Sequence, residues 1–187
     1  MTEKEKMLRG ELYNSSDEVL THELSKAKRL CNEYNKINSE DIEKGEEIIR
    51  KLFGKVGSNF MIMPNFYCDY GYNIEIGDNF YSNHNLVILD ANKVKIGNNV
   101  QIGPNCGIYT SGHPLDKELR KSVEFAKDIT IGNDVWIGGN VCVLPGVTIG
   151  EGAVIGAGSI VTKDIPAGSL AVGNPCKVIK KIYNKEK

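Results

Sequence analysis

His113 is the residue in this sequence best suited to chemistry. It lies between Gly112 and Pro114 in a polar stretch. Proline biases the residue before it towards extended backbone, which helps hold the imidazole in one direction. Histidine, with a reference pKa of about 6.5, can take a proton from a hydroxyl near neutral pH. A general base is therefore one interpretation, and a loop histidine that only forms hydrogen bonds is the other.

The other candidate ligands and nucleophiles are scattered along the chain. The five cysteines form no CxxC pair, so a zinc site or a disulfide lacks the spacing it needs. We expect reduced thiols, several of them packed as small apolar groups. We expect His84 to fill a turn and His22 to lie on the surface of a helix.

The elements that must position His113 are built on a period of six. From Ile131 to Val161 an aliphatic residue returns at every sixth position, and a second small or branched residue follows four positions after each. This period fits neither a helix nor an exposed strand, and it is the hexapeptide signature of a parallel β-helix. Three hexads form one triangular coil, with glycine and asparagine at the corners.

The chain is expected to have two parts. Residues 1–57 form a helical cap, in which apolar residues recur at three- and four-residue steps after Asp17 and again after Asp41. Residues 58–187 form the β-helix. Terminal caps are needed because the coils cover one another but leave the ends open.

The repeat breaks once and then ends in a different pattern. The insert at 109–128 is polar and carries His113, and long loops that project from a solenoid are commonly functional. The segment beyond Pro166 is expected to run back over the last coil and to end in a short basic helix.

Charge and hydropathy limit the partners. A net charge of −1 argues against nucleic acid or an anionic membrane. No apolar run approaches the roughly 18 residues that span a bilayer, and the charged N-terminus lacks a signal-peptide pattern, so we expect a cytoplasmic protein. We expect aliphatic residues such as Ile129 and Val143 to face outward, and if they lie on one face they need a partner, which predicts a homo-oligomer.

Four segments resemble the maltose and galactoside O-acetyltransferases, a branch of the hexapeptide-repeat acyltransferases. They are EKEKMLRGELY at the start, CDYGYNIEIGDNFYSN at 68–83, ITIGNDVWIGGNV at 129–141 and the closing run VTKDIPAGSLAVGNPCKVIKKI. The resemblance covers nearly the whole chain and is closer to the maltose type. It implies a left-handed parallel β-helix and a homotrimer with active sites between subunits. It also implies acetyl-CoA as co-substrate, no required metal and a sugar acceptor.

The resemblance also assigns roles to single residues. His113 is the general base that withdraws the proton of a sugar hydroxyl as it attacks the thioester, and a backbone N–H near Gly139 supports the oxyanion. The acceptor contacts implied are Asn83, Asp69, Ser15 and Asp17. The coenzyme A contacts implied are Gly139, Ala157, Thr162, Lys163, Lys177 and Lys180.

Three departures from the galactoside enzymes bear on the acceptor. Asp69 stands where they have serine, and Ala91 stands where they have an acidic residue. Ser15, with Asp17 two residues on, falls where they have an acidic contact. A maltose- or glucose-like acceptor is therefore favoured over a galactoside.

Several alternatives are open on the sequence. The acceptor could be a galactoside, serine or an antibiotic, and Cys142 offers a covalent route. Trp136 could line either the acceptor site or the trimer interface. A metal hydratase like the γ-type carbonic anhydrases would need three histidines converging on zinc. A non-catalytic scaffold would have no need for a polar insert with a histidine.

Overall fold

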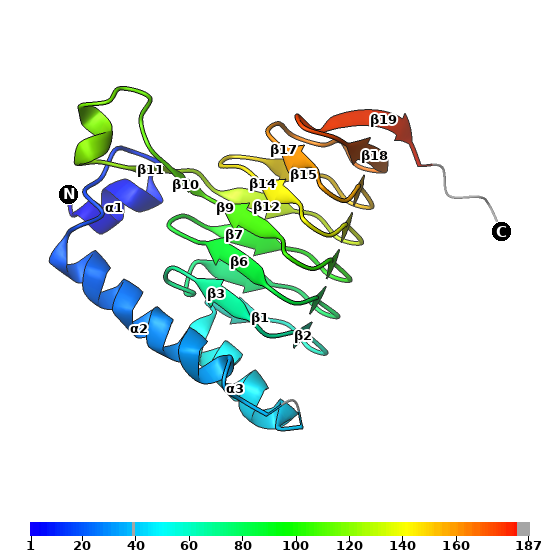
Figure 1. The fold of residues 1–187 in the computed structure, drawn as a ribbon, viewed down its shortest axis with the longest axis horizontal. Helices are drawn as coiled ribbons and strands as arrows, with labels where there is room; N and C mark the ends of the chain where they lie inside the picture. Colours follow the sequence, from blue (N-terminus) through cyan, green and yellow to red (C-terminus); the bar gives the residue numbers. More distant parts are fainter. Residues whose placement is uncertain (39, 183–187) are drawn as a thin grey trace.

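The computed structural model describes residues 1–38 and 40–182 and contains a helical cap and a parallel β-helix (Figure 1). The cap helices are α1 (Glu3–Leu8), α2 (Glu18–Tyr34) and α3 (Ile42–Leu52). Helices α2 and α3 cover the end of the β-helix where its first strands lie. No helix within the described ranges is long and apolar enough to cross a membrane.

The β-helix has three faces, each made of strands from successive coils. Face 1 comprises β1 (Lys55–Val56), β4 (Ile74–Ile76), β7 (Val94–Ile96), β12 (Ile129–Ile131) and β15 (Thr148–Ile149). Face 2 comprises β2 (Met61–Ile62), β5 (Tyr81–Ser82), β8 (Gln101–Ile102), β13 (Trp136–Ile137), β16 (Val154–Ile155), β18 (Ser169–Val172) and β19 (Lys177–Lys181). Face 3 comprises β3 (Phe66–Cys68), β6 (Leu86–Leu89), β9 (Gly107–Tyr109), β14 (Cys142–Val143) and β17 (Ile160–Val161). The expected triangular coil is confirmed.

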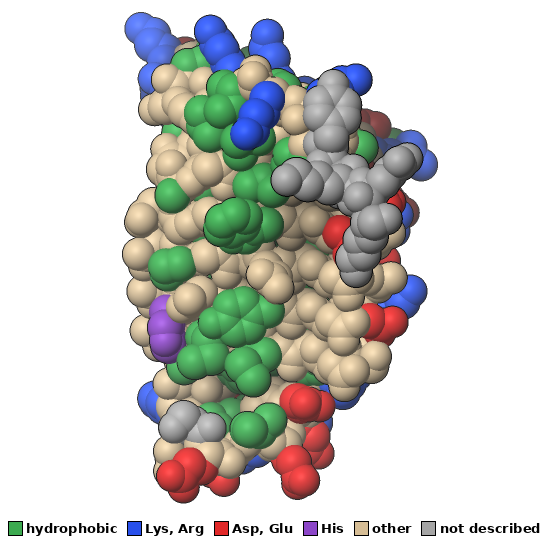
Figure 2. Space-filling view, turned by 90° about the vertical axis from the view of Figure 1, so that its right-hand side faces the viewer, with side chains coloured by type: hydrophobic (Ala, Val, Ile, Leu, Met, Phe, Trp, Pro, Cys, Tyr) green, Lys and Arg blue, Asp and Glu red, His purple; other side chains and the backbone are tan. Residues whose placement is uncertain are grey.

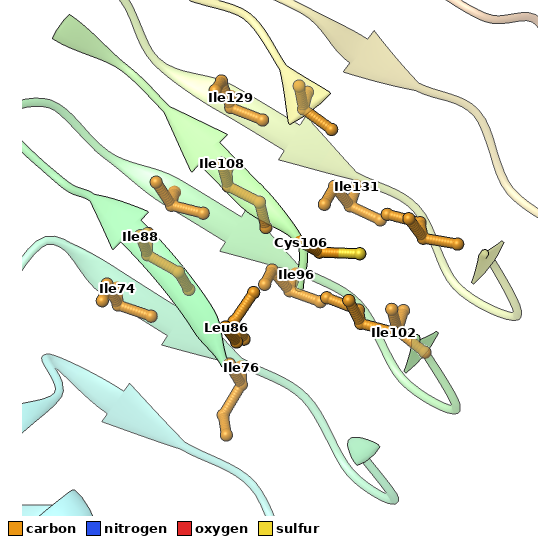
Figure 3. Close-up of a cluster of buried hydrophobic side chains, with 14 of the residues drawn as sticks. Ile74, Ile76, Leu86, Ile88, Ile96, Ile102, Cys106, Ile108, Ile129 and Ile131 are labelled. Carbon is orange, nitrogen blue, oxygen red and sulfur yellow. The ribbon is translucent and has the colours of Figure 1, made fainter. Parts of the chain in front are cut away.

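The period of six is the spacing of the side chains that fill the interior (Figure 3). On face 1, Ile76, Ile96 and Ile131 stack in register and are buried. Burying an aliphatic side chain stabilises the fold by about 1.5–3 kcal/mol relative to leaving it exposed. Ile129 and Val143 also point inward, at 0% and 1% exposure, so the expectation that they face outward is wrong. Ile129 is inward because side chains alternate along a strand and Ile131, two residues on, is inward.

The outward side chains differ from face to face. Face 1 presents the polar column Lys55, Glu75, Lys95, Thr130 and Thr148. Face 2 presents Met61, Tyr81, Gln101, Trp136, Val154 and Leu170, and hydrophobic side chains run along this side of the molecule in Figure 2. Face 3 presents Tyr67, Val87, Gly107, Cys142 and Ile160. Faces 2 and 3 are therefore the apolar faces.

The cap begins and packs as its sequence predicts. The Asp17 carboxylate accepts hydrogen bonds from the N–H groups of Val19 and Leu20, which caps α2. Phe53, at the end of α3, meets Phe66 of the first coil edge to face, with ring centroids 5.4 Å apart. The contact between Phe53 and Phe66 holds the cap against the β-helix.

The C-terminal segment differs from the expected helix. It does run back over the last coil, but Lys177–Lys181 form β19, which pairs antiparallel with β18. The pairing satisfies backbone groups at the open edge of face 2, which a helix would leave unpaired. Residues 183–187, where the expected helix would end, lie outside the described residues.

Two of the three corners matter for the site. The regular corner joins face 2 to face 3 through short connections that contain the turns 63–65, 83–85, 103–105, 138–140 and 156–158. The insert corner joins face 3 to face 1 through the segments 69–73, 90–93, 110–128, 144–147 and 162–164. The insert projects beside α1, away from the coils (Figure 1).

Candidate active site

His113 stands at the loop end of a small hairpin in the insert. Strands β10 (Ser111–Gly112) and β11 (Phe125–Ala126) pair antiparallel, with Gly112 opposite Phe125, and a 3-10 turn, η1 (Leu119–Lys121), lies between them. The His113 side chain is exposed to a cleft of about 330 Å³. The cleft lies between the insert and the loop that precedes α2, and its lining includes Ser15 and Glu124.

The loop before α2 is tied to the insert by Glu124. The backbones of Tyr13 and Glu124 exchange two hydrogen bonds, of 3.0 and 2.9 Å. The Glu124 carboxylate accepts a hydrogen bond from the Ser15 hydroxyl at 2.8 Å and from the Tyr13 hydroxyl at 3.1 Å. Ser15, a predicted acceptor contact, is therefore held in the same cleft as His113. Asp17 instead uses a carboxylate oxygen to cap α2.

Asp69 lies at the same corner, directly after β3. The pKa of its carboxyl is raised to about 6, mainly by burial; Lys28 opposes the shift and the Glu124 carboxylate adds to it. The Asp69 N–H donates to the buried carboxylate of Asp90 at 3.0 Å. Asp90 also accepts from the N–H of Tyr70 at 2.8 Å, so it braces the turn that presents Asp69.

Asn83 lies at the regular corner, which is a different edge of the prism. Its amide oxygen accepts the His84 N–H at 2.7 Å, so its amide nitrogen is left to donate to another group. Gly139 lies at the same corner, two coils beyond Asn83, and Ala157 follows one coil after it. The N–H groups of Gly139 and Ala157 have no hydrogen-bond partner among the described residues.

The remaining predicted coenzyme A contacts lie at the insert corner and on the last strand of face 2. Thr162 and Lys163 follow β17 at the insert corner and are exposed. Lys177 pairs with Val172, beside the last turn of the regular corner, and Lys180 lies opposite Leu170. One chain thus separates the predicted site into two groups, with face 3 between them.

The residues left open by the sequence are placed as follows. Trp136 faces outward from face 2 and is 56% exposed. Cys142 faces outward from face 3, while the other four cysteines are buried and all five are free thiols. His22 is exposed on α2, as expected, and His84 contacts the Pro64 carbonyl. Within residues 1–38 and 40–182, no three His, Cys, Asp or Glu side chains gather in a way that could hold a metal ion.

Comparisons with known proteins match both parts of the chain. Residues 6–57 match the maltose acetyltransferase hexapeptide capping motif, and residues 128–163 match the bacterial transferase hexapeptide repeats. Galactoside O-acetyltransferase of Escherichia coli is 46% identical over 184 residues, which cover 98% of this chain and 91% of that protein. The chain belongs to the maltose and galactoside O-acetyltransferase family.

Solved structures of this family share the whole fold. A maltose O-acetyltransferase from Clostridium difficile superposes with a TM-score of 0.97 at 50% identity, covering 98% of this chain and 99% of that one. A galactoside acetyltransferase in complex with coenzyme A gives a TM-score of 0.95 at 46% identity, covering 98% and 92%. The predicted family and fold class are thereby confirmed, and so is the assignment as an acyltransferase.

Sequence reasoning missed Glu124 and Asp90 as organisers of the site. Glu124 is separated from Tyr13 by 111 positions, and no local pattern joins them. The sequence signal for Glu124 was its acidic side chain near the end of the insert, because the same insert contains His113. For Asp90, the signal was an acidic residue at an otherwise apolar end of a strand.

Proposed function

We propose that this protein transfers an acetyl group from acetyl-CoA to a hydroxyl of a maltose- or glucose-like sugar, as a homotrimer with its sites between neighbouring chains. The observation that supports the proposal most is that the predicted site residues of one chain lie in two separate groups. His113 and Asn83 lie on different corners, separated by one face of roughly 16–20 Å at about 3.3 Å per residue. Packing the regular corner of one chain against the insert corner of the next brings His113 and Asn83 together in one site.

The outward side chains support this arrangement. Faces 2 and 3 present apolar columns, whereas face 1 presents charged and hydroxyl groups. Exposed apolar surface of this extent typically marks an interface. When a chain offers one surface to one neighbour and a different surface to the other, the contacts can close into a ring. Face 1 then stays in solvent.

The reaction assigned to the site is direct transfer. His113 withdraws the proton of the sugar hydroxyl, which is a poor nucleophile until that proton leaves. The free Gly139 N–H supplies a hydrogen bond to the oxygen that becomes negatively charged. Asn83 and Asp69 orient the acceptor. The proton held by His113 is then available to the leaving thiolate, so no acetyl group on Cys142 is required.

The regular corner fits a long thioester arm. Ala157 offers a second free N–H one coil from Gly139, about 4.8 Å along the prism. Small residues at these turns leave the backbone accessible to a ligand. Lys177 and Lys180 lie on β19, beyond the last coil, where their point charges suit phosphate groups. Thr162 and Lys163 come from the insert corner.

Mixing two inactive variants tests the shared site. His113→Ala and Asn83→Ala chains are each expected to be nearly inactive as pure trimers. When they are refolded together in equal amounts, about a quarter of the sites should combine two intact halves, because each heterologous contact draws its halves independently. Recovery of acetyl transfer on mixing is the expected result. No recovery, with mixed trimers verified by mass, would show that each chain contains its own complete site.

An acceptor screen tests the substrate. Free thiol release from acetyl-CoA is followed with glucose, maltose, a galactoside and serine as acceptors. The highest kcat/KM is expected with glucose or maltose, because Ala91 and Ser15 replace acidic acceptor contacts of the galactoside enzymes. Stoichiometric zinc in the purified protein together with no thiol release would instead favour the metal hydratase.

A further inference from the structure

Glu124 is a partly buried carboxylate in the His113 cleft whose role the mechanism above leaves open. Both of its oxygens are engaged by the loop before α2: Oε1 accepts the Ser15 hydroxyl at 2.8 Å, and Oε2 accepts the Tyr13 hydroxyl at 3.1 Å. Its backbone pairs with Tyr13 in both directions. Glu124 therefore connects the N-terminal loop to the insert through four hydrogen bonds.

The register of the hairpin places Glu124 beside His113. Gly112 lies opposite Phe125 in the β10–β11 pair. One step further out, His113 follows Gly112 on one strand and Glu124 precedes Phe125 on the other. Residues opposite each other in an antiparallel pair lie about 4.5–5.5 Å apart at Cβ. The residue that holds Ser15 and the residue that acts as base thus come from adjoining positions of one hairpin.

The direction of the Ser15 hydrogen bond sets what Ser15 can recognise. A carboxylate only accepts hydrogen bonds, so the Ser15 hydroxyl must use its single proton to donate a hydrogen bond to Glu124. The Ser15 oxygen then has only lone pairs to offer to the cleft. A sugar hydroxyl that meets Ser15 must be the donor.

We propose that Glu124 is a positioning residue for the sugar acceptor, which fixes Ser15 as a hydrogen-bond acceptor and ties it to the strand that carries His113. The proposal rests on the proposed sugar acetyltransferase function. It adds that the acceptor site receives a hydrogen bond from the sugar at Ser15. This side of the cleft therefore favours an acceptor whose hydroxyl donates a hydrogen bond to Ser15.

Glu124→Gln tests the polarity with almost no change of shape. The amide can donate to the Ser15 oxygen, so the serine is no longer held in one direction. We expect the KM of the sugar to rise about five- to tenfold, the range for one lost hydrogen bond, with the KM of acetyl-CoA unchanged. Ser15→Ala should have the same effect. The double variant should be no worse than either single variant, because both act through one contact.

Two control variants separate this role from a structural one. Tyr13→Phe removes the other hydrogen bond to the Glu124 carboxylate but leaves Ser15 held, so the sugar KM should not change. Glu118→Gln changes an exposed glutamate of the same insert, which pairs with Lys121, and should also behave as wild type. The melting temperature of each variant is measured alongside.

Defined outcomes would overturn the proposal. An unchanged sugar KM in Glu124→Gln, equal increases in both KM values, or fully additive effects in the double variant would each refute it. A Tyr13→Phe variant that reproduces the Glu124→Gln effect would also refute it, because Glu124 would then only hold the loop against the insert. Failure of the wild-type protein to acetylate any sugar would refute the proposed function instead.

Discussion

The regular corner and the insert corner are made by the same coils but are built in different ways. Each turn of the regular corner is a three-residue unit repeated with little change from coil to coil. The insert corner has segments of different lengths, and one of them reaches out to meet the N-terminal loop. The repeat therefore supplies evenly spaced backbone groups, while its interruption supplies His113, the proposed acid–base side chain.

The turns of the regular corner also differ in the backbone N–H groups that they offer. The middle residue of its turns is Pro64 in the first coil and Pro104 in the third, and proline has no N–H. In the next two coils the middle residues are Gly139 and Ala157, whose N–H groups have no partner among the described residues. In the first and third coils this turn position thus has no N–H, and in the two following coils it has an N–H that can donate a hydrogen bond.

Removing the proposed base, His113, should have the largest effect on activity of the changes considered. His113→Ala is expected to lower kcat about 10³-fold, within the range for general acid–base catalysis, with little change in acetyl-CoA binding. Thiol release and a separate binding titration measure the two quantities. His84→Ala, a histidine at the regular corner, is the matched control and should stay near wild type. Equal losses in the two variants would mean that the insert corner has no special role in the chemistry.

Removing a backbone donor should have the next largest effect. Gly139→Pro copies the residue found at the same turn position in Pro104 and deletes the N–H, so kcat is expected to fall about 10²-fold. Gly139→Ala keeps the N–H and adds a Cβ that would lie 3.2 Å from the Pro104 Cδ, which controls for crowding. Similar rates for the two variants would show that the donor is not used.

Changing the pH should affect the insert corner by a smaller amount. Because burial raises the pKa of Asp69 to about 6, its carboxylate is ionised at pH 7 and mostly protonated at pH 5. The sugar KM should rise severalfold over that range as a hydrogen-bond acceptor is lost. The raised pKa also means that the contribution of Asp69 to the free energy of unfolding falls as pH rises through 6. Asp69→Asn is the control, and its sugar KM should not vary between pH 7 and 5.

The two corners also differ in how much of their structure could be predicted from the sequence. The period of six located the coils, and the break in that period located His113, because both signals lie within a short stretch of chain. The Tyr13–Glu124 pairing could not be predicted because it joins segments that are distant in sequence. The helix expected near the C-terminus failed for a related reason. Lys177–Lys181 is a strand because β18 offers it an open edge, and this tertiary pairing overrides local preference.

The smallest expected effect tests the rigidity of the regular corner. Ser82 points into the core between Ile62 and Ile102, just before Asn83, and its hydroxyl has no hydrogen-bond partner among the described residues. A buried hydroxyl without a partner costs free energy, so Ser82→Ala should raise the free energy of unfolding by up to about 1 kcal/mol. Chemical denaturation measures the change, and kcat should stay the same because Asn83 keeps its backbone bond to Ile102. A loss of activity with the gain in stability would show that the regular corner must move during the reaction.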